Sequence, residues 1–246
     1  MPEYTGPELC ALSAVDAVAA LKAGDVSPTE MLEAALTRIA DVEPKINALP
    51  TICADRARSH IANLEEGDEG PWLAGLPLAI KDLTEVEGVR TTFGSPGFAD
   101  HVPAASTPMV RRLEARGGVV IGKSNTPEMG AGGNTFNPVL GRTLNPWNTA
   151  LNPGGSSGGA AASLAAGEVW LAHGSDLGGS LRTPAAYCGV VGLRPTPGRA
   201  GGGGKDNAFN YEAVQGPMAR TVEDCALFLG HEEWCVRPPM SACIMM

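Results

Sequence analysis

The chain has 246 residues, of which 43% are hydrophobic, and it carries a formal net charge of −9. This length and composition suffice for one large domain or two small ones with a packed core. The negative charge disfavours direct binding to nucleic-acid phosphates or to anionic lipid, so we expect neither nucleic acid nor a membrane as a partner.

The start of the chain and the cysteine pattern indicate a cytoplasmic protein. Residues 1–24 lack the basic start and unbroken apolar stretch of a signal peptide, and no run approaches the roughly 20 apolar residues of a membrane span. The six cysteines are scattered and form no C-x-x-C pair. We therefore expect reduced thiols and no structural zinc site.

Residues 1–66 are predicted to be a helical region that packs on the rest of the chain. Ser13 with Asp16 has the pattern of one N-terminal helix cap, and Ser27-Pro28-Thr29-Glu30 that of a stronger one. Residues 51–64 have the apolar spacing of a third helix. No catalytic pattern is visible in this region.

Residues 67–229 are predicted to form a core in which strands alternate with helices. Short apolar runs bounded by glycine and proline are typical of buried strands, whereas two longer segments have helical composition. The predicted strands are 78–80, 119–121, 169–172 and 190–193, and the predicted helices are 107–116 and 159–166. This alternation predicts an α/β fold.

Two glycine clusters that contain serine follow a lysine in an apolar strand. The clusters are Gly154-Gly155-Ser156-Ser157-Gly158-Gly159 and Asp176-Leu177-Gly178-Gly179-Ser180-Leu181-Arg182, and the lysine lies in Leu78-Ala79-Ile80-Lys81-Asp82. Glycines beside a serine let a substrate carbonyl approach the backbone, and successive N–H groups can then point at one oxyanion. A lysine in apolar surroundings loses its proton more readily. The combination indicates an enzyme with a serine nucleophile.

Two shorter motifs suggest other interpretations. Residues 117–124 match the phosphate-binding pattern G-x-x-x-x-G-K-[ST], but strand-forming residues fill the motif, which favours a helix end followed by a strand. Residues 154–158 match the nucleophile elbow G-x-S-x-G. Ser156, Asp176 and His231 then follow the order of an α/β-hydrolase triad. The segment before Ser156 is typical of a loop and not of a strand, so this triad is the weaker interpretation.

The lysine and serine segments together resemble the amidase signature family. The resemblance covers about residues 8–229, and Lys81 precedes Ser156 by 75 residues, while Ser156 precedes Ser180 by 24. The matching segments are Gly75-Leu76-Pro77-Leu78-Ala79-Ile80-Lys81-Asp82, the two glycine clusters, Pro184, Cys188-Gly189 and Gly192-Leu193-Arg194-Pro195-Thr196. The resemblance implies a mixed sheet flanked by helices.

The same resemblance implies the roles of the site residues. Ser180 corresponds to the nucleophile, Ser156 to a bridging serine held by a cis peptide bond, and Lys81 to the base. A neutral lysine can accept a proton from one hydroxyl through a second hydroxyl, which replaces histidine. The backbone N–H groups expected to form the oxyanion hole belong to Leu177, Gly178, Gly179 and Ser180. The supporting residues are Ser157, Asp176 and Arg182. No metal or organic cofactor is implied.

The resemblance ends near residue 229, and residues 230–246 form an atypical tail. Family members continue for nearly as long again, so we expect a truncated or frameshifted reading frame. An incomplete sheet exposes a strand edge, which predicts homo-oligomers or other self-association.

The predicted activity is hydrolysis of a small-molecule carboxylic amide. One alternative is the glutaminase subunit of a tRNA-dependent amidotransferase. Another is a catalytically silent fragment that acts by association.

Overall fold

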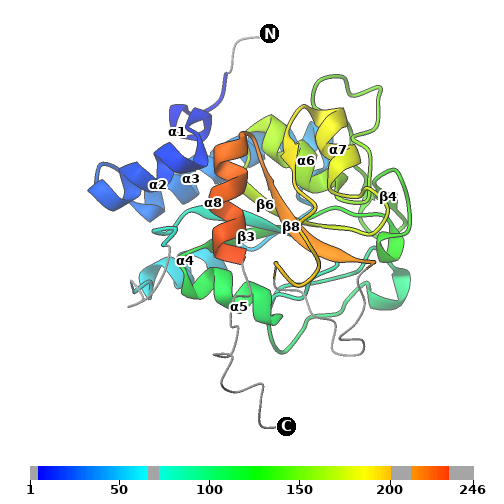
Figure 1. Cartoon of the computed structure of the whole chain (residues 1–246), viewed down its shortest axis with the longest axis horizontal. Helices are drawn as coiled ribbons and strands as arrows, with labels where there is room; N and C mark the ends of the chain where they lie inside the picture. The colour runs from blue at the N-terminus through cyan, green and yellow to red at the C-terminus, as the bar shows by residue number, and fades with distance from the viewer. Residues whose placement is uncertain (1–4, 66–71, 201–211, 233–246) are drawn as a thin grey trace.

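The chain forms an α/β structure in which helices flank a six-stranded sheet (Figure 1). A computed structural model describes residues 5–65, 72–200 and 212–232, so most of the predicted tail lies outside the described residues. The strands of this sheet are β1 (Thr51–Ile52), β2 (Pro77–Lys81), β3 (Val119–Ser124), β6 (Leu171–Asp176), β7 (Val191–Gly192) and β8 (Val214–Ala219). Their order across the sheet is β1-β3-β2-β6-β8-β7. The fold class predicted from the sequence is confirmed.

The central strands are parallel and buried on both faces. β2 pairs in parallel with β3 on one side and with β6 on the other, and all residues of β2 and β3 are buried. Such strands consist of nearly continuous apolar runs, which explains why their sequences predicted them. β1 and β8 run antiparallel to their neighbours, and this makes the sheet mixed.

Two helices, α2 (Ala14–Ala23) and α3 (Pro28–Ile46), begin where the sequence predicts a cap. Ser13 Oγ accepts a hydrogen bond from the Asp16 N–H at 3.0 Å, and Ser27 and Glu30 form a reciprocal capping box. Both predicted caps are confirmed.

The helices are α1 (Glu8–Ala11), α2 (Ala14–Ala23), α3 (Pro28–Ile46), α4 (Ala54–Ala62), α5 (Pro108–Ala115), α6 (Gly158–Ala166), α7 (Arg182–Cys188) and α8 (Val222–Glu232). Two short 3-10 turns, Pro96–Phe98 and Glu128–Gly130, and the hairpin of β4 (Phe136–Asn137) and β5 (Gly141–Arg142) complete the described chain.

Helix α8, near the end of the described chain, contacts the helices at its start. Its Asp224 accepts a hydrogen bond from the Val15 N–H at 2.9 Å, and Arg220, just before the helix, donates to the Cys10 carbonyl at 2.9 Å. In Figure 1 the blue N-terminal helices accordingly lie beside orange α8. The first helices of the chain are therefore fixed to the element that covers β8.

The prediction of one helix over residues 51–64 is wrong at its start. Thr51 and Ile52 form edge strand β1, which pairs with Lys123 and Gly122 of β3. A Cβ on Gly122 would lie 2.8 Å from the Thr51 carbonyl oxygen, so glycine permits this close approach. Sheet hydrogen bonds here outweigh the helical pattern, and the helix begins only at α4.

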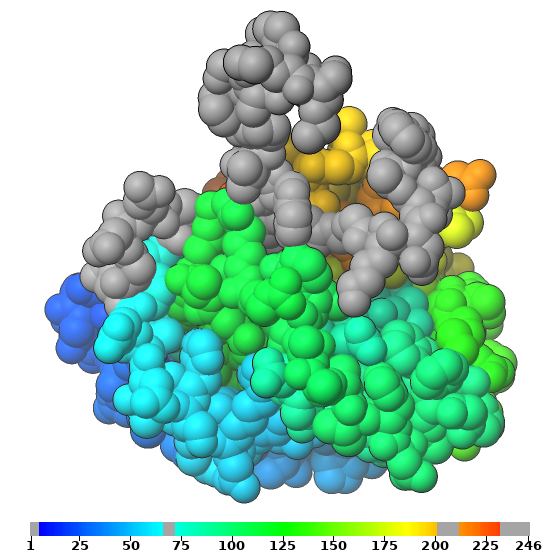
Figure 2. Space-filling view, turned by 90° about the horizontal axis from the view of Figure 1, so that it is seen from below, coloured from blue at the N-terminus to red at the C-terminus, as the bar shows by residue number. Residues whose placement is uncertain are grey.

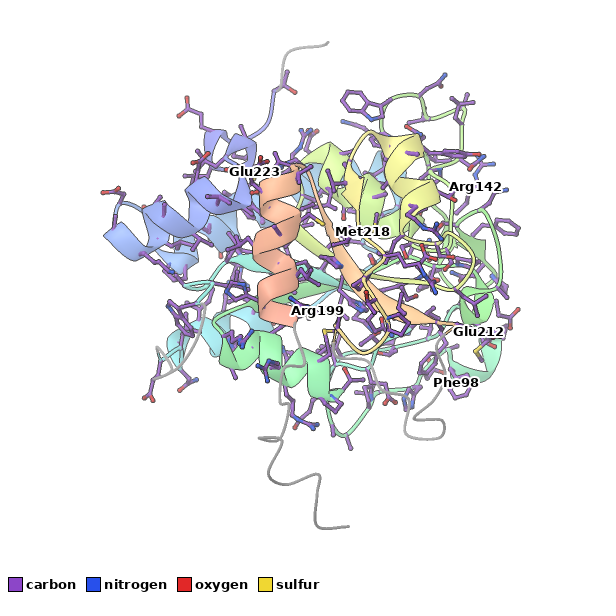
Figure 3. The ribbon with its side chains drawn as sticks, in the orientation of Figure 1. Phe98, Arg142, Arg199, Glu212, Met218 and Glu223 are labelled. Atoms are coloured by element: carbon purple, nitrogen blue, oxygen red, sulfur yellow. The ribbon has the colours of Figure 1, made fainter. Side chains whose placement is uncertain are left out.

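The surface and the core differ as expected for a packed domain. Met218 of β8 is fully buried and lies near the centre of the molecule, whereas Phe98 and Arg142 lie at its edge (Figure 3). Seen from below, the cyan to green part of the chain, which includes α4 and α5, makes up most of the visible surface (Figure 2). No helix in the described ranges combines the length and apolar character that crossing a bilayer requires.

Candidate active site

The candidate site lies where three parallel strands end. β2 ends at Lys81, β3 at Ser124 and β6 at Asp176, so these residues share the carboxyl edge of the sheet. Ligand sites of open α/β sheets typically occupy this edge. The topology thus brings together two segments, around residues 81 and 176, that lie far apart in sequence.

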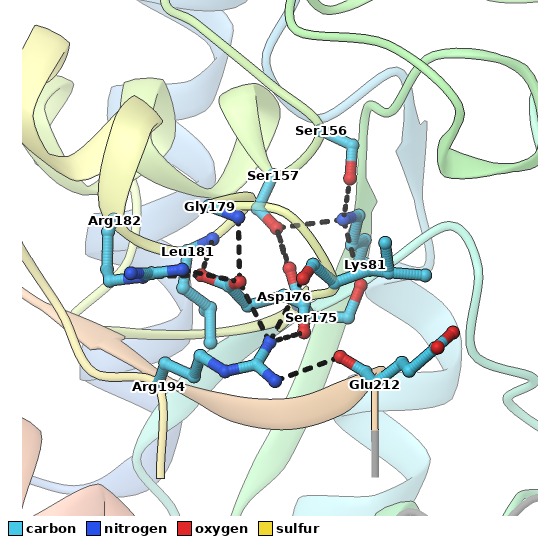
Figure 4. Close-up of polar contacts among 11 residues, drawn as sticks. Lys81, Ser156, Ser157, Ser175, Asp176, Gly179, Leu181, Arg182, Arg194 and Glu212 are labelled. Atoms are coloured by element: carbon cyan, nitrogen blue, oxygen red, sulfur yellow. Dashed lines mark hydrogen bonds and ion pairs between the residues drawn. The ribbon is translucent and has the colours of Figure 1, made fainter. Parts of the chain in front are cut away.

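Lys81 is fully buried, and its amine lies within hydrogen-bond distance of three serine hydroxyls. Its Nζ is 2.7 Å from Ser156 Oγ, 2.8 Å from Ser157 Oγ and 3.0 Å from Ser175 Oγ (Figure 4). Burial lowers the pKa of Lys81 to about 7, although the Asp176 carboxylate opposes this shift. Near neutral pH the amine therefore exists in both forms, and the neutral form can accept a proton from a hydroxyl.

Ser156 and Ser157 lie at the entry to α6, where glycines allow very close packing. The Gly155–Ser156 peptide bond is cis. A Cβ on Gly159 would lie 2.3 Å from the Asn125 backbone nitrogen, so the first turn of α6 presses on the end of β3. Ser157 Oγ also donates to the Ser175 carbonyl at 3.2 Å. These contacts fix both hydroxyls beside Lys81.

Ser180 lies in the turn between β6 and α7 and is half-buried. Its carbonyl accepts a hydrogen bond from the Ser157 N–H at 3.2 Å, which joins the two serine clusters through their backbones. Its hydroxyl forms no hydrogen bond with the Ser156 hydroxyl or with any other group of the described chain. The structure therefore brings Lys81 and Ser156 together and places Ser180 on the adjoining turn.

The Asp176 carboxylate organises that turn. Fully buried, it accepts hydrogen bonds from the Gly179 and Leu181 N–H groups at 2.8 and 3.1 Å, and from the Arg182 guanidinium at 3.0 Å. Burial alone would raise the pKa of Asp176, but these hydrogen bonds, with a further one from Arg194, lower it well below its usual range. Asp176 is therefore ionised throughout the neutral range.

One oxyanion-hole expectation differs from the structure. The Gly179 N–H donates to Asp176, so it does not face a free site. The N–H groups of Leu177, Gly178 and Ser180 have no hydrogen-bond acceptor within the described residues. Gly179 has a φ of 110°, a conformation that side chains other than hydrogen rarely allow, which accounts for glycine at this position.

Ser175 and Arg194 also belong to the site, although the sequence analysis gave neither of them a role. Ser175 precedes Asp176 on β6 and contacts the Lys81 amine. Arg194 Nη1 lies 3.0 Å from Asp176 Oδ1, and Nη2 donates to the Glu212 carbonyl at 2.9 Å (Figure 4). A polar residue at the carboxyl end of a parallel strand was the available signal for Ser175. Arg194 lies within a family motif, but the sequence did not show that it contacts Asp176.

The two rival motifs have other surroundings. Residues 117–124 follow α5 and contain β3, so the phosphate-loop pattern is a helix end followed by a strand, as predicted. His231 Nδ1 is bonded to the Leu227 carbonyl at 2.7 Å, and its pKa is lowered by burial and by the charges of Arg116 and Lys22. His231 therefore lies in α8 and forms its hydrogen bond within that helix. Among the described residues, no group of three acidic, cysteine or histidine side chains could hold a metal ion.

Comparison with known proteins gives a consistent result. A family model described as Amidase matches residues 30–235. A Glutamyl-tRNA(Gln) amidotransferase subunit from Roseiflexus sp. (strain RS-1) is 47% identical over 223 residues, which are 89% of this chain and 45% of that protein. The protein of the same name from Anaeromyxobacter dehalogenans (strain 2CP-C) is 42% identical, over 92% of this chain and 47% of that protein.

Solved structures agree with the sequence comparisons. A bacterial aryl acylamidase of the amidase signature enzymes superposes with a TM-score of 0.83 at 35% identity, covering 90% of this chain and 47% of that one. A 6-aminohexanoate cyclic dimer hydrolase complexed with substrate gives a TM-score of 0.82 at 34% identity, covering 91% and 46%. This chain spans about half the length of the curated relatives that it matches.

Proposed function

Because this chain belongs to the amidase family, we propose that it carries the catalytic residues of a carboxylic amide hydrolase. The observation that carries the proposal is the buried Lys81 amine, with its lowered pKa, 2.7 Å from the Ser156 hydroxyl. A base buried beside a hydroxyl, next to a turn that bears a second serine, matches the requirements of nucleophilic catalysis without histidine.

In the proposed reaction, Ser180 Oγ attacks the amide carbonyl carbon. The Ser180 proton passes to Ser156 Oγ while the Ser156 proton passes to neutral Lys81. The C–N bond then breaks, and the leaving ammonia or amine takes a proton from Ser156, which is replaced from Lys81. Water then attacks the ester carbonyl and passes one proton through Ser156 to Lys81. The bond between the acyl carbon and Ser180 Oγ breaks, and Ser180 Oγ takes the proton back from Lys81 through Ser156. The carboxylic acid that is released ionises in solvent. No metal or organic cofactor is required.

The relay needs one adjustment of the described geometry. The Ser180 hydroxyl must form a hydrogen bond with Ser156 that the described structure does not contain, and catalytic hydrogen bonds are often formed only when substrate binds. The Leu177, Gly178 and Ser180 N–H groups would stabilise the oxyanion, where loss of one donor typically slows a reaction about 100- to 1,000-fold. Gly179 would join them only if its N–H left Asp176. Ser157, Asp176 and Arg182 support the arrangement.

The direct test is ammonia release from a panel of primary and aryl amides, including glutamine. We expect turnover by the wild-type chain, and none by Ser180→Ala at equal folded fraction, as judged by circular dichroism. Equal turnover by the two proteins would refute the assignment of Ser180. We further propose that the chain acts in the cytoplasm, because its six cysteines are scattered in sequence and form no C-x-x-C pair.

The second candidate is the glutaminase part of a tRNA-dependent amidotransferase. It is favoured by the curated relatives, which are named as Glutamyl-tRNA(Gln) amidotransferase subunits. Glutamine-specific turnover that rises when the remaining subunits of such an enzyme are added would support it, and equal turnover of unrelated amides would oppose it. A fragment that folds and pairs with another chain but hydrolyses no amide would instead fit the silent alternative.

Self-association is the proposed oligomeric behaviour. Leu177, Phe136, Leu151 and Trp147 are each more than half exposed, which leaves apolar surface uncovered on the described chain. Sedimentation velocity should therefore show species larger than the monomer, and a single monomeric species at high concentration would contradict the proposal.

A further inference from the structure

A fully buried ion pair lies at the residue that follows Lys81. Lys123 Nζ is 3.1 Å from Asp82 Oδ1, and neither side chain has any exposure. Lys123 also donates to Thr91 Oγ1 at 2.6 Å, while Asp82 Oδ2 accepts from the Thr92 N–H and hydroxyl at 3.0 and 2.6 Å. Such a pair adds little net stability, because the cost of desolvating both charges offsets much of their attraction.

Asp82 is adjacent to Lys81 in sequence, and the two side chains serve different networks. Lys81 contacts the serine hydroxyls, whereas Asp82 contacts Lys123 and Thr92. The Asp82 N–H donates to the Ser124 carbonyl at 3.0 Å, which holds this residue at the end of β3. One stretch of backbone therefore carries both the amine and the ion pair.

From Asp82 a chain of contacts leads to a backbone segment beside Ser156. The Asp82 carbonyl accepts from the Phe93 N–H at 3.1 Å, and the Phe93 carbonyl accepts from the Met129 N–H at 2.7 Å. Next to Met129, a Cβ added to Gly130 would lie 2.6 Å from a Leu83 methyl carbon and 3.7 Å from Ser156 Oγ. Gly130 thus lies close to the Ser156 hydroxyl, and the Met129 N–H connects this segment to Phe93 and so to Asp82.

We propose that Asp82 and Lys123 are positioning residues that hold the Thr92–Gly94 loop, and through it Met129–Gly130, against the Lys81–Ser156 pair and keep that pair free of water. This positioning role matters for catalysis only within the proposed amidase function, on which it rests. The physical claim, that the ion pair keeps the amine dry, does not depend on turnover.

The pKa of Lys81 measures directly whether water reaches its amine. Burial lowers its pKa, so water admitted to the amine should raise the pKa toward its ordinary value. The other groups that act there are Asp176, which raises the pKa of Lys81, and His173, which burial keeps neutral with a pKa of about 3. Asp82 and Lys123 have opposite charges, so removing both leaves the net local charge unchanged.

The test is a pH titration of the whole chain labelled with 13C-lysine, in which the Lys81 side-chain resonance is assigned with Lys81→Met. We expect the double variant Asp82→Asn/Lys123→Met to titrate about one pH unit or more above wild type, since desolvation alone can shift a pKa by several units. Thr92→Val, which removes one link from Asp82 to the loop and leaves the charges paired, should shift the midpoint in the same direction.

Control variants separate positioning from general stability. Arg56→Met/Glu114→Gln removes a 2.6 Å ion pair between α4 and α5, and we expect it to lower Tm without moving the Lys81 midpoint. An unchanged midpoint in folded Thr92→Val, or in the folded double variant, would overturn the proposal. A wild type with a depressed Lys81 midpoint that hydrolyses no amide would instead refute the proposed function and leave this inference standing.

Discussion

At the scale of single residues, the proposed catalysis depends on a lysine that loses its proton near neutral pH. If neutral Lys81 accepts the Ser156 proton, the rate of Ser180 acylation should rise with pH and level off above about 7, where the amine is mostly neutral. The rate of reaction with a fluorophosphonate, measured from pH 5 to 9, checks this. A rate that falls across that range would rule out Lys81 as the base.

The Asp176 turn gives a comparison between two arginines. The Arg194 side chain is 25% exposed and that of Arg182 is 57% exposed, although both bond the same buried carboxylate. We expect Arg194→Ala to lower the free energy of unfolding by about 2 to 3 kcal/mol, as for a hydrogen bond to a buried charge. Arg182→Ala should lower the free energy of unfolding by less than Arg194→Ala does, because solvent screens an exposed partner. Urea unfolding of both variants measures the difference, and equal losses would contradict it.

Most residues of the candidate site could be identified from the sequence, but the contacts among them could not. The glycine clusters and the apolar strand singled out Lys81, Ser156 and Ser157, and the family resemblance gave them roles. The structure places both serine hydroxyls within hydrogen-bond distance of the Lys81 amine. Ser175 and Arg194 were missed because each acts through a partner distant in sequence. The use of the Gly179 N–H by Asp176 was also invisible, since it depends on the conformation of one turn.

At the scale of elements, the entry of α6 is held by glycine. A Cβ at Gly159 would meet the Asn125 nitrogen at 2.3 Å and the Ala48 carbonyl at 2.6 Å, and neither backbone atom can move freely. We expect Gly159→Ala to destabilise the chain by about 1 to 3 kcal/mol or more, as overpacking does. Gly230→Ala in α8, where a Cβ meets nothing within 4 Å, is the matched control and should be neutral or stabilising. Thermal unfolding that ranks the two variants equally would contradict this packing argument.

A carboxyl pair between α3 and the segment after α6 makes stability depend on pH. Burial raises the pKa of Glu43, although its Oε1 accepts hydrogen bonds from the Leu49 and Ala48 N–H groups at 2.8 and 2.7 Å, which favour the charged form. Burial first, and then the Glu43 charge, raise the pKa of Glu168 well above its ordinary value of 4.5. Because the folded pKa of Glu168 is raised, its neutral form contributes stability fully below about pH 4.5, and that stability is lost as pH rises through the folded value.

Glu168→Gln tests this contact, because glutamine retains the shape and a donor without a titratable group. We expect the Tm of the variant to exceed that of wild type increasingly as the pH is raised from 5 to 9. A difference in Tm that is constant with pH would show that Glu168 does not titrate in this range.

The elements themselves were predictable wherever one local pattern dominated. The apolar runs of β2 and β3 and the capping box of α3 have a strong local signal. Thr51 and Ile52 have no such local signal, because their pairing with β3 is a tertiary contact. β8 was not predicted either, since Gly216 and Pro217 interrupt its pattern and pairing with β6 maintains the strand.

At the scale of the whole molecule, the parallel strands explain why distant motifs form one site. β2 and β6 are neighbours in the sheet, so Lys81 and the Asp176 turn share one edge although 94 residues separate Lys81 from Ser175. The serine cluster at α6 completes the site from the adjoining loop. The sequence resemblance anticipated this grouping, whereas composition and periodicity alone indicated only an α/β fold.

The central claim is that Ser180 is a nucleophile activated through Ser156 and Lys81 in the chain as it stands. The most direct measurement is intact mass with peptide mapping after exposure to a fluorophosphonate, with Ser180→Ala as the control. We expect a single adduct on Ser180 of the folded wild type and no adduct in the variant. An adduct on Ser156 instead, or none on folded wild-type protein, would contradict the claim.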